Sequence, residues 1–146
     1  MAVLSNTELR SSFPGITPGF VYTSALVYGI PTLEYLQGPF YDYWIHTLGG
    51  LNLWTSKWEC WDFTSSYLVE LAKANALTPA TPTGETTLSV GRWDFHPDAE
   101  RLAGNPTGHS IIAAITDQGL RYLDPQNNTL WSPSSNELAS TRLLLF

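Results

Sequence analysis

The sequence has a single cysteine, Cys60, and few charged side chains, which make up 14% of its 146 positions. One cysteine forms neither an intramolecular disulfide nor a cysteine-ligated zinc cluster, so packing must hold the fold together. A chain of this length buries roughly 70% of its unfolded surface, which is enough for one core. With 43% hydrophobic residues, the composition predicts a single folded domain over residues 1–146 and excludes a disordered chain.

Basic residues and long hydrophobic runs are also scarce. Seven Lys and Arg stand against 13 Asp and Glu, for a net charge of −6. Sequence-independent nucleic-acid binding needs clustered Lys and Arg, so we expect no nucleic-acid partner. No stretch approaches the roughly 18 apolar residues of a membrane span, and the first ten residues lack a signal-peptide pattern. These absences predict a soluble, non-exported protein, cytoplasmic by default.

Aromatic residues, in contrast, are abundant: the chain has six Trp, seven Tyr and six Phe. Rings in such number either pack into a core or face a ligand.

Composition divides the chain into four segments. Pro14, Gly15, Pro18 and Gly19 predict an extended arm over residues 1–19. Residues 20–77 are expected to be mainly helical or irregular. Residues 78–87 have the Pro- and Thr-rich composition of a linker, and residues 88–146 form a β half.

The clearest helical pattern covers residues 56–77. Phe63, Tyr67 and Leu71 are spaced by four and line one face. Ser56 and Glu59 have the spacing of a capping box, which predicts the helix start and places Cys60 in its first turns.

The strand signals lie after residue 87. Residues 88–95 predict a strand with a bulge at Gly91, and residues 110–116 are apolar on both faces, as in a buried central strand. A turn over residues 117–119 leads into a partner strand at 120–123, and residues 141–146 predict a last strand. The expected fold class is α+β, with the Cys60 helix of an N-terminal helical or irregular half packed on a C-terminal antiparallel β-sheet.

Three polar residues have positions that suit catalysis. Cys60 lies near a helix start, while His109 and Asp124 lie at the same open end of the predicted hairpin. A helix N-terminus and an imidazolium lower a thiol pKa to between about 3.5 and 7.5, which makes the thiolate available as a nucleophile. A carboxylate at the far ring nitrogen fixes the imidazole and its tautomer. The pattern therefore predicts a Cys60–His109–Asp124 triad that needs no cofactor.

These residues resemble the transglutaminase-like branch of the papain-like cysteine enzymes. The resemblance lies in Cys60-Trp61-Asp62-Phe63 at a helix start, Gly108-His109, and Leu123-Asp124-Pro125, in the order Cys, His, Asp. The 49 residues from Cys60 to His109 and the 15 from His109 to Asp124 also fit, and about half of the chain is covered. The resemblance implies a helix packed on an antiparallel sheet, with the cysteine presented at the helix N-terminus.

The predicted activity is that of a cysteine-dependent amide or ester hydrolase or acyl transferase, such as a peptidase, a deamidase or a transglutaminase. Its partner would be a peptide, a protein or another amide substrate. The Cys60 amide is one natural oxyanion donor, and Trp54, Asn52 and Gln37 are open candidates for the second. Trp54, Trp58 and Trp61 are candidates to wall a groove beside Cys60 or to form core; core is favoured for Trp61 and the groove for one of the other two.

A different class of function competes with catalysis. On the same scaffold, the Trp and Tyr side chains could bind sugar rings or an apolar partner surface, in a non-catalytic binding, virion or assembly module.

Two further clusters are interpreted without a functional role. Asp94, His96, Asp98 and Glu100 carry ligand atoms at alternate positions, but Pro97 among them and the lack of a second histidine favour a solvated acidic loop over a metal site. We therefore expect no metal. His46 is interpreted as a structural or surface histidine.

Overall fold

A six-stranded sheet, in the order β2-β8-β4-β5-β6-β7, forms the centre of the computed structural model, which describes residues 3–47, 59–101 and 108–146. A second sheet pairs β1 with β3. The elements are β1 (Val3–Ser5), α1 (Asn6–Arg10), the 3-10 helix η1 (Pro18–Phe20), β2 (Val21–Tyr22), β3 (Val27–Gly29), α2 (Leu33–Gln37), α3 (Pro39–Thr47), α4 (Cys60–Leu77), β4 (Val90–Phe95), β5 (His109–Thr116), β6 (Gly119–Asp124), β7 (Thr129–Trp131), α5 (Ser135–Ala139) and β8 (Leu143–Leu145).

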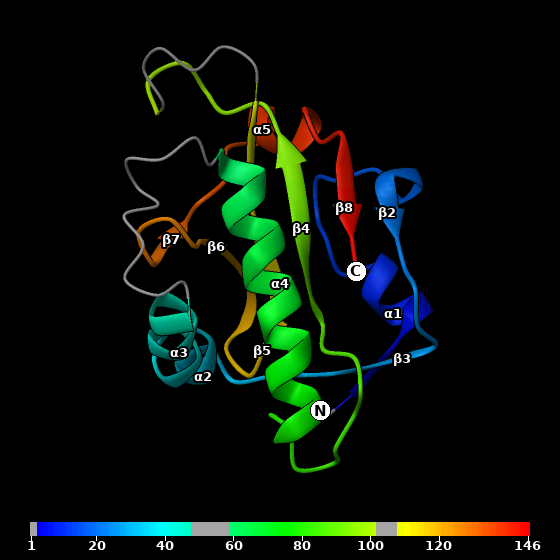
Figure 1. Cartoon of the computed structure of the whole chain (residues 1–146). Coiled ribbons are helices and arrows are strands. Elements are labelled where there is room, and N and C mark those ends of the chain that lie inside the picture. Colours follow the sequence, from blue (N-terminus) through cyan, green and yellow to red (C-terminus); the bar gives the residue numbers. More distant parts are fainter. Residues whose placement is uncertain (1–2, 48–58, 102–107) are drawn as a thin grey trace.

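The structure has three layers: helices α2, α3 and α4, the main sheet, and the N-terminal segment. Figure 1 shows α4 across one face, with α2 and α3 beside it, and α1 below β2 and β8 near the C-terminus. Two core clusters fill the spaces. The first joins α2, α3 and α4 to the sheet through Phe40, Trp44, Phe63, Tyr67, Leu71, Ile112 and Leu123. The second joins the N-terminal segment to the other face through Leu9, Phe13, Trp93, Phe95, Ile111, Tyr122 and Leu144.

The α+β fold class is confirmed, with a helix packed against a mixed sheet. Strands β4 to β7 are antiparallel to their neighbours, and β8 is antiparallel to β4. The expectation of a purely antiparallel sheet is wrong in one place, because β2 comes from the N-terminal half and pairs parallel to β8.

The extended arm expected over residues 1–19 is also wrong. Within the described residues of this segment lie β1, α1 and the beginning of η1. Ser5 and Glu8 form a capping box that starts α1: Ser5 Oγ accepts from the Glu8 amide at 3.1 Å, and the Glu8 carboxylate accepts from the Ser5 amide at 3.0 Å. The helix buries Leu9 completely against the sheet, which offsets the cost of ordering the segment.

Gly91 does not mark a bulge. The register of β4 and β5 runs unbroken from Val90 opposite Ala114 to Phe95 opposite His109. A Cβ atom on Gly91 would lie 2.4 Å from the backbone oxygen of Leu145, so the glycine permits the close approach of β4 and β8.

None of the helices in the described part of the chain is long and apolar enough to cross a membrane.

Candidate active site

Cys60 is the first residue of α4. The expected capping box of Ser56 and Glu59 is wrong, because Glu59 is itself the N-cap and Ser56 lies outside the described residues. The Asp62 carboxylate accepts a hydrogen bond from the Glu59 amide at 2.8 Å, which holds the chain at the helix start. Because Cys60 is the first residue of the helix, its thiol lies at the positive end of the helix dipole. The residue is half-buried, so the thiol remains accessible.

A buried hydrogen bond fixes this helix end to the sheet. Thr64, one turn after Cys60, donates through Oγ1 to the backbone oxygen of Ser110 at 2.9 Å. Ser110 directly follows His109, the first residue of β5. The bond therefore holds the first turn of α4 beside the start of β5.

We expect the substitution Thr64→Val to lower the free energy of unfolding by about 1–3 kcal/mol, because a buried carbonyl loses its donor while the side-chain volume is kept. Urea denaturation measures this loss. Thr64→Ser keeps the hydroxyl and should recover most of the difference; equal stability of Thr64→Val and the unmodified protein would contradict the prediction.

His109 and Asp124 form a buried pair at the same end of the sheet. The distance between His109 Nε2 and Asp124 Oδ2 is 2.9 Å, and each residue is 5% exposed. Asp124 Oδ1 accepts from the Gln126 amide at 3.0 Å. The carboxylate is thus held by the turn after β6 and accepts a hydrogen bond from Nε2, which assigns Nε2–H to the imidazole.

The other ring nitrogen, Nδ1, is buried and makes no hydrogen bond to any described residue. Cys60 is close enough to interact with the imidazole. The imidazole and the thiol are thus neighbours, although Nδ1 has no hydrogen-bond partner among the described residues.

Opposing effects set the pKa of His109. Burial lowers it, whereas the hydrogen bond to Asp124 and the interaction with Cys60 raise it, and the net effect is a pKa of about 9 instead of 6.5. His109 is therefore an imidazolium at neutral pH, in contact with an acceptor at Nε2 and near a thiol. The structure brings Cys60, His109 and Asp124 together.

Aromatic rings surround the imidazole. The ring centroids of Phe95 and Trp131 lie 5.9 and 5.5 Å from that of His109. On the other side of the pair, the Tyr41 hydroxyl donates to the Pro125 carbonyl at 2.9 Å. Burial, with a smaller effect of Asp124, raises the pKa of Tyr41 to about 12, so this hydroxyl stays a donor. The rings limit the access of water to the pair.

The remaining sequence candidates have different outcomes. Asn52, Trp54 and Trp58 lie outside the described residues. Gln37 and Asn128 exchange two hydrogen bonds, each amide donating to the other's backbone oxygen at 3.3 and 2.8 Å, which ties α2 to the turn before β7. The Gln37 amide thus has a structural partner, and a role as oxyanion donor stays a prediction.

Trp61 is not in the core. It is 49% exposed, because the second position of α4 points away from the sheet while Phe63 and Thr64 point into it. The expectation of a core residue is wrong, and Trp61 presents its ring to solvent next to Cys60.

The acidic loop does not gather ligands. The Asp94 carboxylate is engaged by Arg92, whose Nε and Nη2 donate to its two oxygens at 2.8 and 2.7 Å. Within the described residues, no three His, Cys, Asp or Glu side chains are placed to hold a metal ion. His46 is exposed on α3, with Nδ1 2.6 Å from the Asp42 backbone oxygen, as expected for a surface histidine.

The sequence did not predict Trp131, which lies beside His109, or its two partners Arg101 and Glu137. The Arg101 guanidinium lies 4.6 Å from the Trp131 ring centroid, and the fully buried Glu137 carboxylate accepts from the Trp131 indole at 3.3 Å. A signal was present in Ser134-Ser135-Asn136-Glu137, whose spacing is that of a capping box. It predicts helix α5 but not the contacts of its carboxylate.

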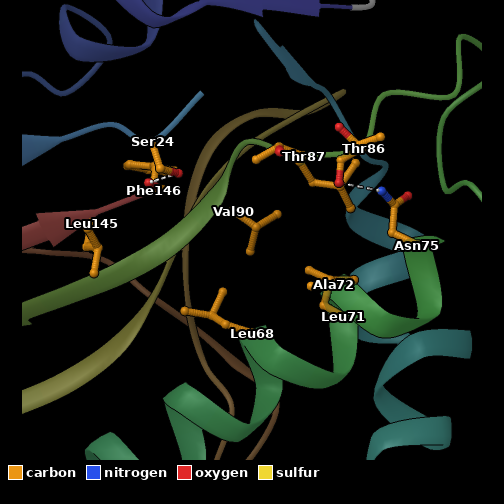
Figure 2. Close-up of a pocket in the computed structure, with 11 residues that line it drawn as sticks. Ser24, Leu68, Leu71, Ala72, Asn75, Thr86, Thr87, Val90, Leu145 and Phe146 are labelled. Carbon is orange, nitrogen blue, oxygen red and sulfur yellow. Dashed lines mark hydrogen bonds between the residues drawn. The ribbon is translucent and has the colours of Figure 1, made fainter. Parts of the chain in front are cut away.

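A separate cavity of about 410 Å³ lies between α4, β4 and β8. Figure 2 shows Leu68, Leu71 and Val90 lining it, with Asn75 hydrogen bonded to the Thr86 backbone. Its lining from α4 begins two turns after Cys60, so it is distinct from the Cys60–His109–Asp124 site.

Comparison with known proteins establishes a fold. No protein-family model matches the chain, and no curated protein matches it. Among solved structures, the chain is similar to one described as a PSL1a-E64 complex, with 16% sequence identity and a TM-score of 0.68. The similarity covers 99% of this chain and 50% of that one, so this chain spans about half the length of that structural neighbour. At this identity, the two proteins share a fold.

Proposed function

We propose that this protein is a cysteine-dependent amide or ester hydrolase or acyl transferase that uses Cys60, His109 and Asp124. The observation that carries the proposal is the buried His109–Asp124 pair, joined at 2.9 Å, whose imidazole interacts with the thiol at the N-terminus of α4 and has a second ring nitrogen without a hydrogen-bond partner among the described residues. Each of the three groups has the partner that nucleophilic catalysis requires.

The reaction begins from the state in which Cys60 is a thiolate and His109 is an imidazolium that carries a proton on Nδ1. The thiolate attacks the substrate carbonyl carbon, and the carbonyl oxygen becomes an oxyanion, for which the Cys60 amide at the helix N-terminus is a donor. The leaving amine or alcohol departs with the proton from Nδ1, and a thioester remains on Cys60. Water or an amine then attacks the thioester and gives its proton to the neutral His109 imidazole. The C–S bond breaks, the acid or the new amide is released, and the thiolate and imidazolium are restored.

The resemblance to transglutaminase-like cysteine enzymes supports this proposal, since its cysteine, histidine and aspartate positions are Cys60, His109 and Asp124, and His109 interacts with both of the others. A cysteine nucleophile also agrees with the single, unpaired Cys60. Such a thiol stays reduced inside a cell, so a cytoplasmic location belongs to the same proposal.

One observation favours a second candidate, a non-catalytic binding module. Trp61 exposes 49% of its surface beside Cys60, and an exposed indole is a platform for a sugar ring or an apolar partner. Under this alternative, the Cys60→Ala variant would bind its ligand as tightly as the unmodified protein does, and the unmodified protein itself would not be acylated.

The test is acylation by p-nitrophenyl acetate at pH 6. We expect a burst of nitrophenolate that approaches one equivalent and an acetyl group on the Cys60 peptide by mass spectrometry, because the paired thiolate attacks the ester. Hydrolysis or transfer is then distinguished by adding a primary amine. The structural neighbour forms a complex with E64, so prior incubation with E64 should also suppress the burst.

Matched variants make this test specific. Cys60→Ala should abolish the burst, while His46→Ala, which removes an exposed histidine far from the pair in sequence, should leave it unchanged. A burst no faster than that of the urea-unfolded chain at the same pH would refute the proposal and favour the binding module.

A further inference from the structure

Glu137 is a carboxylate with no exposed surface, and its partners come from three parts of the chain. Oε1 accepts from the Ser134 amide at 2.9 Å and from the Trp131 indole at 3.3 Å, and it lies 3.5 Å from Arg101 Nε. Oε2 accepts from the Asp98 amide at 3.1 Å. A buried charge is costly without partners, so these contacts are mutually dependent.

Trp131 connects Glu137 to the catalytic pair. Its ring lies 5.5 Å from the His109 ring at an interplanar angle of 43°, and it contacts Phe95 edge-on at 5.5 Å. An imidazolium at this distance gains from the electron-rich indole face. The indole has one N–H, and Glu137 accepts it, so the orientation of the ring depends on the carboxylate.

Glu137 also holds the segment that follows β4. Its contacts with Asp98 and Arg101 restrain residues 96–101, and Ser140 Oγ accepts from the His96 amide at 2.8 Å. Figure 1 shows α5 at the end of the sheet where β4 ends and α4 begins. The segment after β4 and strand β7, which both lie near His109, are thus held by contacts with the short helix α5.

We propose that Glu137 is a positioning residue, which holds Trp131 against the His109 imidazole and so keeps the His109–Asp124 pair dry and oriented. The inference rests on the proposed function, because it assigns a support to that catalytic pair. Glu137 acts through Trp131 and touches neither substrate nor the reacting atoms.

The test is an NMR titration of the His109 imidazole in the Cys60→Ala background, which reads the pair without any reaction. Glu137→Gln keeps the shape of the side chain but loses its charge. Its side-chain NH2 group would also face the N–H donors that now bind the Glu137 carboxylate. Trp131 is then released and water reaches the pair, which weakens both the burial that lowers the pKa of His109 and the attraction to Asp124 that raises it. We expect a net change of about 0.5 or more in the pKa of His109. The charged or titratable groups around the imidazole are Asp124 on β6, Cys60 on α4, Arg101 and Glu137 beyond Trp131, and Arg142 beside Gly108.

Two further variants separate positioning from general support of the helix. Ser134→Ala removes the side-chain cap of α5, the bond from the Glu137 amide to Ser134 Oγ at 3.1 Å, but spares the carboxylate contacts; it should leave the titration within about 0.2 of the parent. Trp131→Phe removes the indole N–H and should shift the pKa of His109 in the same direction as Glu137→Gln does, and the double variant should show no additional shift.

An equal shift in Ser134→Ala, or additive shifts in the double variant, would overturn the inference. Should Glu137→Gln fail to fold, Trp131→Phe decides alone, since an unchanged His109 titration in that variant refutes the role. If Cys60 proves inert towards esters while Glu137→Gln still shifts the titration, the proposed function fails and the support of the pair by Glu137 stands.

Discussion

Replacing His109 by alanine is expected to lower the rate of Cys60 alkylation by iodoacetamide at pH 6 about 100-fold. An ordinary thiol with a pKa of ~8.5 is only about 0.3% thiolate at this pH, and the proposed reaction needs the thiolate that a neighbouring imidazolium stabilises. The gain in thiolate exceeds the loss of intrinsic nucleophilicity that accompanies pairing. The rate is measured by mass spectrometry of the single cysteine between pH 5 and 9.

The other histidine and aspartate variants should react at rates that depend on their distance from Cys60. His46→Ala removes an exposed histidine on α3 and should alkylate like the unmodified protein. Asp124→Asn should give an intermediate rate, because the imidazole keeps its place but loses the carboxylate that stabilises its proton. A thiol that reacts at the same rate with and without His109 would show that the two groups do not form a pair.

The second large effect is a loss of stability at alkaline pH. The pKa of His109 is raised from 6.5 to about 9 in the folded protein, so the folded state holds the proton more tightly than the unfolded state. This contribution is fully present below about pH 6.5 and is lost as the pH rises through 9. The difference corresponds to about 3 kcal/mol. Urea unfolding at pH 6 and pH 10 should therefore show the unmodified protein losing about that much relative to His109→Gln.

The comparison with His109→Gln isolates the part of the stability change that depends on the charge of His109, because groups that do not interact with His109 titrate alike in both proteins. Glutamine keeps an N–H donor for Asp124 and fills a similar volume. Repeating the measurement in the Cys60→Ala background should reduce the loss without changing its sign, since Asp124 still raises the pKa. Parallel pH profiles of the two proteins would contradict the assignment of an imidazolium.

Local patterns in the sequence predicted the elements that carry the site. The run Ile111-Ile112-Ala113-Ala114 is apolar on both faces, and β5 is indeed covered by a core cluster on each side. Gly119 takes the positive φ of 86° that the predicted turn requires, which fixes the register of β5 and β6. That hairpin is sufficient to bring His109 and Asp124 together, because they lie on adjacent strands at its open end.

Other features depended on contacts that no local pattern records. The Pro and Gly residues near the N-terminus indicated an extended arm, yet Leu9 and Phe13 pack on the sheet face opposite α4. The capping box of α4 was assigned three residues too early, since Ser56 and Glu59 have the same spacing as Glu59 and Asp62. Trp61 was expected in the core because of its size, but the rotation of the helix about its axis turns it outward.

The sequence by itself determined the α+β class, the helix that carries Cys60, the hairpin, and the His109–Asp124 pair, because each depends on residue periodicity, turn chemistry or neighbouring strands. Only the tertiary structure decided how Cys60 meets that pair, through Thr64 and Ser110, and how the N-terminal segment covers the second face of the sheet. It also gave Glu137 its contacts with Trp131 and Arg101. The physical reason is that these interactions join residues separated along the chain, whose partners are set by packing and burial and leave no periodic trace in the sequence.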